Sequence, residues 1–239
     1  MFHKIKNSTT KDQRYLMAKD KFLEYSFEAL GNPFSSRDEF NAFFNRISTD
    51  TGKSLFLRTA LFYLFLVKNG DWHIKVQGSD SVVEYLTNTY KYISIFSLIE
   101  SLSDDKYIDF YQFITMRRTK ERFPIEDRKA LEVLYRSYKT KYGSTMKCIS
   151  FFKKLSPRRQ RDLVNKLQVH GHGPTASIEK LAKYLYDLRS RFVHEAEFVH
   201  HMSMGTSVSY KDGRMIVCTL SIADAMKFFE EGLIAYFHD

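Results

Sequence analysis

The chain has 239 residues, of which 44% are hydrophobic, and its formal net charge is +9. This length suits one large domain or two small ones, and the hydrophobic fraction is sufficient for a substantial core. Two cysteines exclude a disulfide-rich scaffold and, without a typical secretory leader, they predict a reducing, cytoplasmic environment. The longest apolar run, residues 54–67, is shorter than a membrane span requires, so we expect no membrane partner.

The basic charge is concentrated in one part of the chain. Residues 111–170 contain 16 Lys and Arg against 5 Asp and Glu, a local balance of +11 that leaves −2 for the remainder. Such a segment attracts polyanions, nucleic acid being the commonest, although basic solvated helices without a ligand are also common. We interpret its densest cluster as a track for the phosphate backbone of a nucleic acid, with a solubilising surface as the alternative. The cluster consists of Lys153, Lys154, Arg158, Arg159 and Arg161.

The first 79 residues are predicted to be a mainly helical N-terminal region, packing either separately or as part of one domain. Apolar periodicity and capping residues predict helices at residues 11–30, 35–47 and 51–68. Residues 51–54, with the sequence TGKS, suggest a phosphate loop, but that motif needs a glycine where Ile47 stands. We therefore exclude a Walker-type site, and we predict a boundary or an irregular connection at residues 69–79.

A series of helices is predicted after this boundary, at residues 81–102, 104–122, 124–142, 144–155 and 156–167. Glu100 follows an apolar run near the end of the first of these helices. It is a candidate supporting acid for a functional site, or a residue that turns to solvent. The segment 170–174, HGHGP, is predicted to be a loop, and no metal site is expected because a cysteine cluster, a His-Glu-x-x-His helix and an acidic triad are all missing.

A helix at residues 175–198 combines an apolar stripe with polar residues that packing does not explain. Arg189 lies at the margin of this stripe, whereas His194 lies roughly 150° from its centre, on the face that a monomer leaves exposed. About 7.5 Å of helix rise separates the two residues, so we expect that they can contact opposite sides of one phosphate. The alternative is a structural ion pair for Arg189 and a capping or packing role for His194.

The C-terminal segment predicts the only strands. Residues 206–210 and 214–220 alternate in the manner of strands and are joined by a turn that contains Asp212 and Gly213. Ser221 then caps a final helix, supported by Asp224. The predicted fold class is all-α, with a small β-hairpin before the last helix.

Residues 186–195, YDLRSRFVHE, follow a basic helical region and precede the hairpin and the last helix. In this context the stretch resembles the Apea-like branch of the HEPN domains, and residues 95–102 are similar to the first core helix of that family. The resemblance covers roughly residues 80–239. The family signature is an arginine, four to six residues, and a histidine, which Arg189 and His194 match, while Ser190 stands where the family often has Asn, Asp or His.

The resemblance implies a HEPN-like helical bundle that cleaves RNA without a metal or another cofactor. RNA supplies its own nucleophile, the 2′-hydroxyl, so the protein needs to provide proton transfer and charge stabilisation. His194 would act as general base or acid, Arg189 would hold the scissile phosphate, and Ser190 would donate a further hydrogen bond. Arg191, on the same helix, is added to the residues expected to bind RNA.

The resemblance also implies partners. Members of the family commonly form homodimers that place two such helices face to face, which fits a histidine on the outer side of its helix. A toxin or defence effector of this kind would be held in check by an antitoxin or a defence-system partner. The alternative is a non-catalytic HEPN module that binds RNA or a nucleotide, or that serves as a protein-interaction scaffold.

Overall fold

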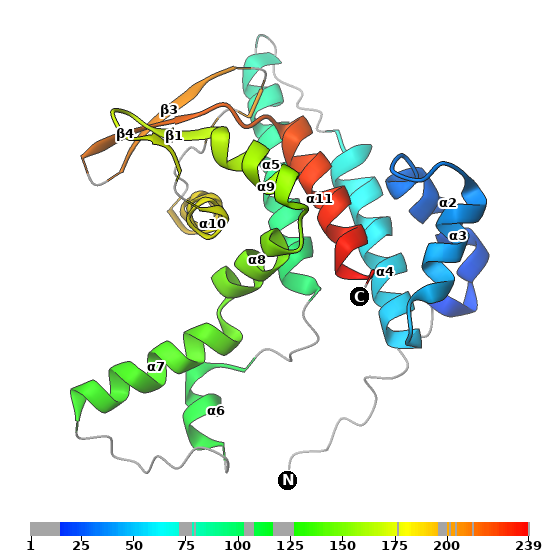
Figure 1. Ribbon diagram of the computed structural model, residues 1–239, viewed down its shortest axis with the longest axis horizontal. Coiled ribbons are helices and arrows are strands. Elements are labelled where there is room, and N and C mark those ends of the chain that lie inside the picture. The colour runs from blue at the N-terminus through cyan, green and yellow to red at the C-terminus, as the bar shows by residue number, and fades with distance from the viewer. Residues whose placement is uncertain are drawn as a thin grey trace.

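The computed structural model describes residues 15–71, 78, 80–102, 108–116, 127–175, 177–195, 200, 202–203, 205–211 and 213–238. Most of these residues are helical, and a small antiparallel sheet is formed largely by strands that precede the last helix (Figure 1). The predicted all-α class with a C-terminal hairpin is therefore confirmed. None of the described helices has both the length and the apolar character needed to cross a membrane.

Among the described residues, three helices form the N-terminal region, and side-chain caps begin the second and third of them. They are α2 (Lys19–Leu30), α3 (Arg37–Arg46) and α4 (Asp50–Tyr63), which continues into the π-helical turn η1 (Leu64–Lys68). The Ser36 hydroxyl accepts the backbone N–H of Glu39 at 3.2 Å, and the Thr49 hydroxyl accepts that of Gly52 at 3.0 Å. Gly52 thus belongs to the first turn of α4, which agrees with the exclusion of a phosphate loop.

The C-terminal part contains α5 (Asp80–Ser101), α6 (Phe110–Thr115), α7 (Arg128–Tyr142), α8 (Ser144–Lys153), α9 (Pro157–Asn165), α10 (Ile178–Glu195) and α11 (Ile222–Tyr236). Helix α10 packs against α5, α8 and α9. The Tyr92 hydroxyl of α5 donates to the Leu185 carbonyl of α10 at 2.5 Å, which fixes these two buried helices relative to each other. In contrast, α6 and α7 extend away from the other helices (Figure 1).

The N-terminal helices share buried contacts with the C-terminal helix. The ring of Phe56 in α4 lies 5.5 Å from that of Phe237, and the ring of Tyr63 lies 4.8 Å from that of Phe229 in α11. The Tyr63 hydroxyl also donates to Glu230 of α11 at 2.7 Å. Aromatic packing and a partly buried hydrogen bond therefore join α4 to the end of the chain.

Two predicted helices differ from the structure. Within residues 104–122, the described helix is only α6, which begins at the cap Asp109, and residues 103–107 and 117–126 lie outside the described part. Helix α7 begins after Asp127, whose carboxylate accepts the backbone N–H of Lys129 at 2.8 Å. Pro124, the predicted start, lies outside the described residues.

The sheet is larger than the predicted hairpin. It has the order β2-β1-β4-β3, formed by β1 (Leu167–Val169), β2 (Gly173–Pro174), β3 (Ser207–Lys211) and β4 (Arg214–Cys218). The predicted hairpin is β3-β4, and Gly213 adopts a φ of +72° at its turn, as such a turn requires; Asp212 lies outside the described residues. The loop prediction at residues 170–174 was wrong in part, because β1 and β2 pair across that segment. The preceding helix also ends earlier than predicted, and Leu167 begins β1.

Candidate functional site around the motif helix

Helix α10 places the motif arginine beside an acid of α5. Nη2 of Arg189 lies 3.2 Å from Oε1 of Glu100, and its guanidinium lies 5.7 Å from the ring centre of Tyr186. The side chains of Arg189 and Glu100 are 15% and 24% exposed. The acid that the sequence suggested as a supporting residue is therefore an immediate, mostly buried neighbour of Arg189.

The Arg189–Glu100 contact leaves hydrogen-bonding capacity unused. Nε of Arg189 is buried and has no hydrogen-bond partner among the described residues, and the same is true of Oε1 of Glu100, despite the short ion-pair distance. The geometry is therefore that of an electrostatic contact and not of an aligned bidentate pair. Because this Nε is buried, a phosphate oxygen reaches the donor only after the Arg189 side chain moves.

His194 lies in the last turn of α10 and is exposed. It is five residues from Arg189, which corresponds to about 7.5 Å of rise and a rotation of roughly 140° around the helix axis. Arg189 faces α5, whereas His194 faces solvent. The expectation that the two side chains contact one phosphate therefore stays a prediction.

Ser190 opens onto a cavity of about 650 Å³. Helix α10 contributes four residues at helical spacing to its wall, namely Lys183, Tyr186, Asp187 and Ser190. The opposite wall is formed by the end of α7 and the start of α8. Because Tyr186 contacts both this cavity and the Arg189 guanidinium, the cavity adjoins the motif arginine.

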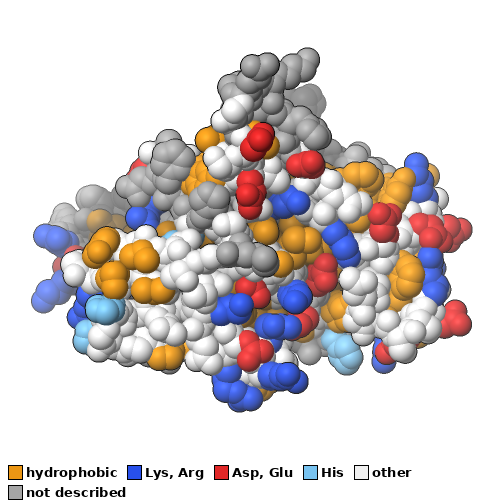
Figure 2. All heavy atoms as spheres, turned by 90° about the horizontal axis from the view of Figure 1, so that it is seen from above, with side chains coloured by type: hydrophobic (Ala, Val, Ile, Leu, Met, Phe, Trp, Pro, Cys, Tyr) orange, Lys and Arg blue, Asp and Glu red, His pale blue; other side chains and the backbone are white. Residues whose placement is uncertain are grey.

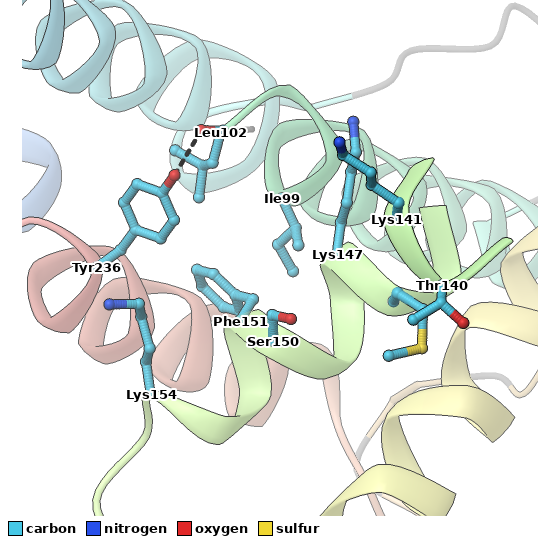
Figure 3. Close-up of a pocket in the computed structure, with 10 residues that line it drawn as sticks. Ile99, Leu102, Thr140, Lys141, Lys147, Ser150, Phe151, Lys154 and Tyr236 are labelled. Carbon is cyan, nitrogen blue, oxygen red and sulfur yellow. Dashed lines mark hydrogen bonds between the residues drawn. The ribbon is translucent and has the colours of Figure 1, made fainter. Parts of the chain in front are cut away.

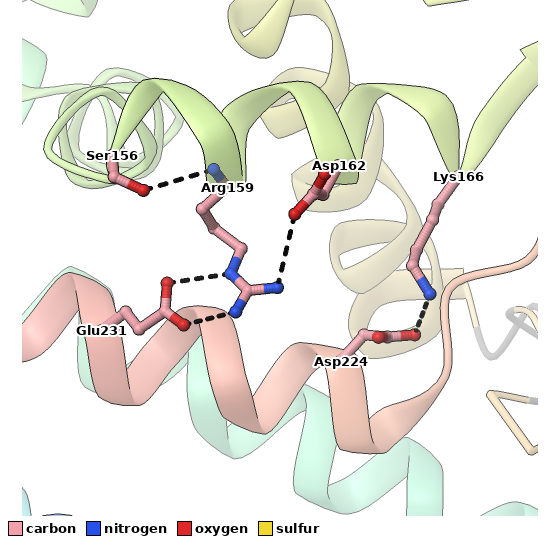
Figure 4. A network of polar contacts seen from close by, with 6 residues as sticks. All are labelled: Ser156, Arg159, Asp162, Lys166, Asp224 and Glu231. Carbon is pink, nitrogen blue, oxygen red and sulfur yellow. Dashed lines mark hydrogen bonds and ion pairs between the residues drawn. The ribbon is translucent and has the colours of Figure 1, made fainter. Parts of the chain in front are cut away.

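Within the basic cluster of the sequence, Arg159 has a structural contact. Its Nε donates to Glu231 of α11 at 2.8 Å, and a second, shorter contact makes this interaction bidentate (Figure 4). These hydrogen bonds raise the pKa of Arg159. Lys166 contacts Asp224 of α11 at 2.8 Å in the same way. These contacts attach α9 and the segment after it to α11.

The remaining residues of the cluster differ in their environment. Lys153 contacts Glu179 at 2.9 Å, which holds the pKa of that carboxyl at about 2, and Lys154 lies 5.4 Å from the ring centre of Tyr236. Arg158 and Arg161 are exposed, and Arg191 of α10 lies 3.7 Å from Asp187. On the face shown in Figure 2, basic and acidic side chains are interspersed. A high local count of cations thus does not form one uninterrupted basic patch there.

A buried polar cluster was missed by sequence reasoning. The Tyr184 hydroxyl lies 2.6 Å from Nε2 of His200 and 2.8 Å from Oγ of Ser209. Burial, and then the charge of Arg191, lowers the pKa of His200 to about 4. The three residues come from α10, a loop and β3, so no local pattern of the sequence links them. Among the described residues, no group of three or more His, Cys, Asp and Glu is placed to hold a metal.

No family model matches the chain, and no curated protein or solved structure is significantly similar to it. A functional proposal for this protein therefore rests on its own residues and their geometry, together with the short stretch that resembles the HEPN signature.

Proposed function

We propose that this protein is a metal-independent endoribonuclease of HEPN type. The observation that carries the proposal is the environment of Arg189. Its guanidinium is held beside Glu100 with an unused Nε donor, on the same helix that ends with the exposed His194. An oriented cation and a titratable imidazole supply what cleavage by the 2′-hydroxyl needs.

In the proposed reaction the 2′-oxygen attacks the adjacent phosphorus, and the bond from phosphorus to the 5′-oxygen breaks. His194 takes the proton of the 2′-hydroxyl while water protonates the leaving 5′-oxygen, or His194 protonates the 5′-oxygen while water takes the 2′-proton. Arg189 stabilises the additional negative charge on the phosphoryl oxygens, and Ser190 donates a further hydrogen bond. The products carry a 2′,3′-cyclic phosphate and a 5′-hydroxyl.

We further propose that the active form is a homodimer. His194 is exposed on α10, whereas Arg189 contacts Glu100 of α5. Two copies of α10 placed face to face through the exposed side would put both His194 side chains at the dimer interface. Such an enzyme would damage cellular RNA, so a role as a toxin or defence effector restrained by an antitoxin or defence-system partner is part of the proposal.

The second candidate is a non-catalytic HEPN module that binds RNA or a nucleotide, or that acts as a scaffold. It is favoured by the ion pair itself, because contact with Glu100 gives Arg189 a structural role without any substrate. Ser190, where the family often has Asn, Asp or His, also fits a site that has lost its reaction.

The two candidates are separated by incubating the purified protein with structured RNA in EDTA. If the protein is an endoribonuclease, cleavage yields 2′,3′-cyclic phosphate ends, and His194→Ala lowers the rate roughly 100- to 1000-fold. His172→Ala, at another exposed histidine, is the matched control and should cleave normally. Binding of RNA without cleavage by the parent protein would instead support the module.

Arg189→Ala leaves Glu100 without its partner and risks a loss of stability, so Arg189→Lys is tested beside it. Lysine keeps the charge but lacks the planar fork of donors, and we expect cleavage to fall at least about tenfold in a folded protein. The dimer is tested by diluting the protein through the concentration at which light scattering detects monomers. Full activity per chain in the monomer would contradict a site composed from two copies.

A further inference from the structure

The junction of α7 and α8 separates two cavities. We call residues 138–147 the elbow, because α7 ends there at Tyr142 and α8 begins at Ser144, with Gly143 between them. A cavity of about 380 Å³ lies on the side of the elbow that faces α5 and α11, and the cavity of about 650 Å³ lies on the side that faces α10. Thr140 and Met146 line both, so the two cavities adjoin each other across the elbow.

The smaller cavity has lysine side chains around its opening and apolar side chains at its base. It is lined by Lys141, Lys147 and Lys154, and none of the described residues that line it carries a carboxylate. In Figure 3 the side chains of Lys141 and Lys147 extend toward the same edge, and Lys154 lies on the other side, below Tyr236. Ile99 and Phe151 are buried beneath. Three amines around one opening attract an anion, and they also repel one another while the opening is empty.

The larger cavity is aromatic and continues toward the motif helix. Tyr138 and Tyr142 line it from the elbow, and Tyr186 lines it from α10. Lys139 and Lys183 provide amines at its walls, opposed by one acid, Asp187. Basic side chains interleaved with aromatic rings are the pattern by which proteins hold unpaired nucleotides.

Helix α7 itself is unusual in having no buried residue along its 15 positions. Its tyrosines form a continuous row, with ring centres 6.3 Å apart between Tyr135 and Tyr138 and 5.9 Å apart between Tyr138 and Tyr142. Helix α7 extends away from the other helices (Figure 1), and the last two tyrosines of the row line the larger cavity. The row also packs against Phe110 and Phe113 of α6, and Tyr142, which is half-buried, keeps part of its surface at the larger cavity.

We propose that the elbow is a binding site for single-stranded RNA, in which an unpaired base stacks against Tyr142 in the larger cavity while phosphates lie along Lys147 and Lys183. This inference deepens the proposed function, on which it rests for the identity of the polyanion. An RNA strand bound at the elbow would extend toward Ser190 and Arg189. It also places RNA binding on residues outside the dense cluster of α9.

A single strand is specified because a paired base cannot enter a cavity. In a duplex the bases are stacked within the helix, and a protein reaches mainly the phosphates and the 2′-hydroxyl groups. A tyrosine-lined cavity of several hundred cubic ångströms accepts the flat face of one base, whatever its identity. The site is therefore expected to be sequence-tolerant and sensitive to salt.

The test measures binding of a fluorescent 12-nucleotide RNA, fully 2′-O-methylated, by anisotropy. This probe lacks the free 2′-hydroxyl, so binding is measured independently of cleavage. We expect Lys147→Glu/Lys183→Glu to weaken binding at least about tenfold, and Tyr142→Leu to weaken it by roughly the same factor, as the loss of one stacked base predicts. Tyr142→Phe keeps the ring and should bind as the parent does.

The control is Lys21→Glu/Lys53→Glu, which makes the same charge change on α2 and α4, and binding should stay within about twofold of the parent. Circular dichroism verifies that each variant is folded. The inference is overturned if the elbow variants bind like the parent, or if the same strand annealed to its complement binds equally well. It is also overturned if poly-glutamate, and not RNA, binds in a manner that depends on Lys147 and Lys183, which would indicate an acidic protein partner.

The outcomes distinguish the two proposals. Binding that depends on the elbow, in a protein that never cleaves unmodified RNA, would retain the elbow as a binding site and contradict the endoribonuclease. Cleavage that depends on His194 but is indifferent to Lys183 and Tyr142 would retain the enzyme and contradict the elbow.

Discussion

Helices α7 and α9 come from the same basic segment of the sequence, yet their cations serve different purposes. In α9, Arg159 is bound to Glu231 of α11, and Lys166 immediately after the helix is bound to Asp224. In α7, no residue is buried, and Lys139 and Lys141 lie over the rings of neighbouring tyrosines. Arg159 thus attaches α9 to another helix, whereas the cations of α7 contact groups of α7 itself, as Arg128 and Arg136 do with Glu132.

The comparison shows that counting cations does not locate a binding surface. The sequence places its densest basic cluster at residues 153–161, whereas the structure shows some of these charges facing carboxylates, as at Arg159 and Lys153. Ion pairs of this kind neutralise the field that would attract a phosphate. Lysines beside aromatic cavities are better candidates, because an aromatic ring leaves the charge of the amine in place.

The largest difference in stability is expected between aromatic truncations in the exposed helix α7 and at a buried position of helix α8. Phe152 of α8 is fully buried, so Phe152→Ala should lower the free energy of unfolding by about 3–5 kcal/mol. Tyr135 of α7 is 45% exposed, and Tyr135→Ala should cost less than about 1 kcal/mol. Urea denaturation of both variants measures the two values. Equal losses would show that α7 is as much a part of the core as α8.

Acid should destabilise the fold through His200, which contacts Tyr184 of α10. Its pKa is about 4 in the folded chain and about 6.5 when unfolded, so the unfolded state binds more protons between these values. The contribution of His200 is therefore complete above pH 6.5, decreases as the pH falls, and is lost at about pH 4, at a cost of up to about 3 kcal/mol. Denaturation of the parent and of His200→Asn across this range measures the difference in slope. Parallel curves for the two proteins would contradict this assignment.

Much of the fold could be predicted because the periodicity and the caps are local. Ser36 and Ser221 begin helices where the sequence places them, and the α10 stripe is buried as its spacing requires. Strands β1 and β2 were missed because they have three and two residues, too few for an alternating pattern. Their pairing depends on β4, about 50 residues later, where Leu167 opposes Cys218.

Individual residues of the candidate site could be predicted from the sequence, but their arrangement in space could not. The sequence singled out Glu100 and Arg189, and the structure places them in contact. The joint action of Arg189 and His194 on one phosphate stays a prediction, because their spacing fixes only the rise and the rotation between them. The elbow was not predicted, because its cavities depend on how α7, α8 and α10 meet in space.

A smaller change in stability is expected from the close packing between α8 and α11. A Cβ on Gly232 would lie 2.5 Å from the buried ring of Phe151. Alanine favours a helix over glycine by about 1 kcal/mol, but overpacking should exceed this gain, so Gly232→Ala should destabilise by about 1–2 kcal/mol net. Gly205→Ala, with no atom within 4 Å of the added Cβ, is the control and should be nearly neutral. The loss should shrink in a Phe151→Leu background, and a stabilised Gly232→Ala protein would show that the ring moves freely.

The smallest expected change in stability comes from removing the charged side chain of Arg159. Arg159 is 27% exposed, so solvent screens its contact with Glu231, and Arg159→Ala should lower the free energy of unfolding by only about 1 kcal/mol. Arg158→Ala, at an exposed neighbour on the same helix, should change it by less than about 0.5 kcal/mol. A double-mutant cycle with Glu231→Gln isolates the pair, and its coupling energy should account for most of the loss.

The affinity for single-stranded RNA should change less in Arg159→Ala than in Lys183→Ala, because the α9 guanidinium faces α11. If Arg159→Ala instead leaves the stability unchanged and weakens RNA binding about tenfold, Arg159 binds RNA and does not attach α9 to α11.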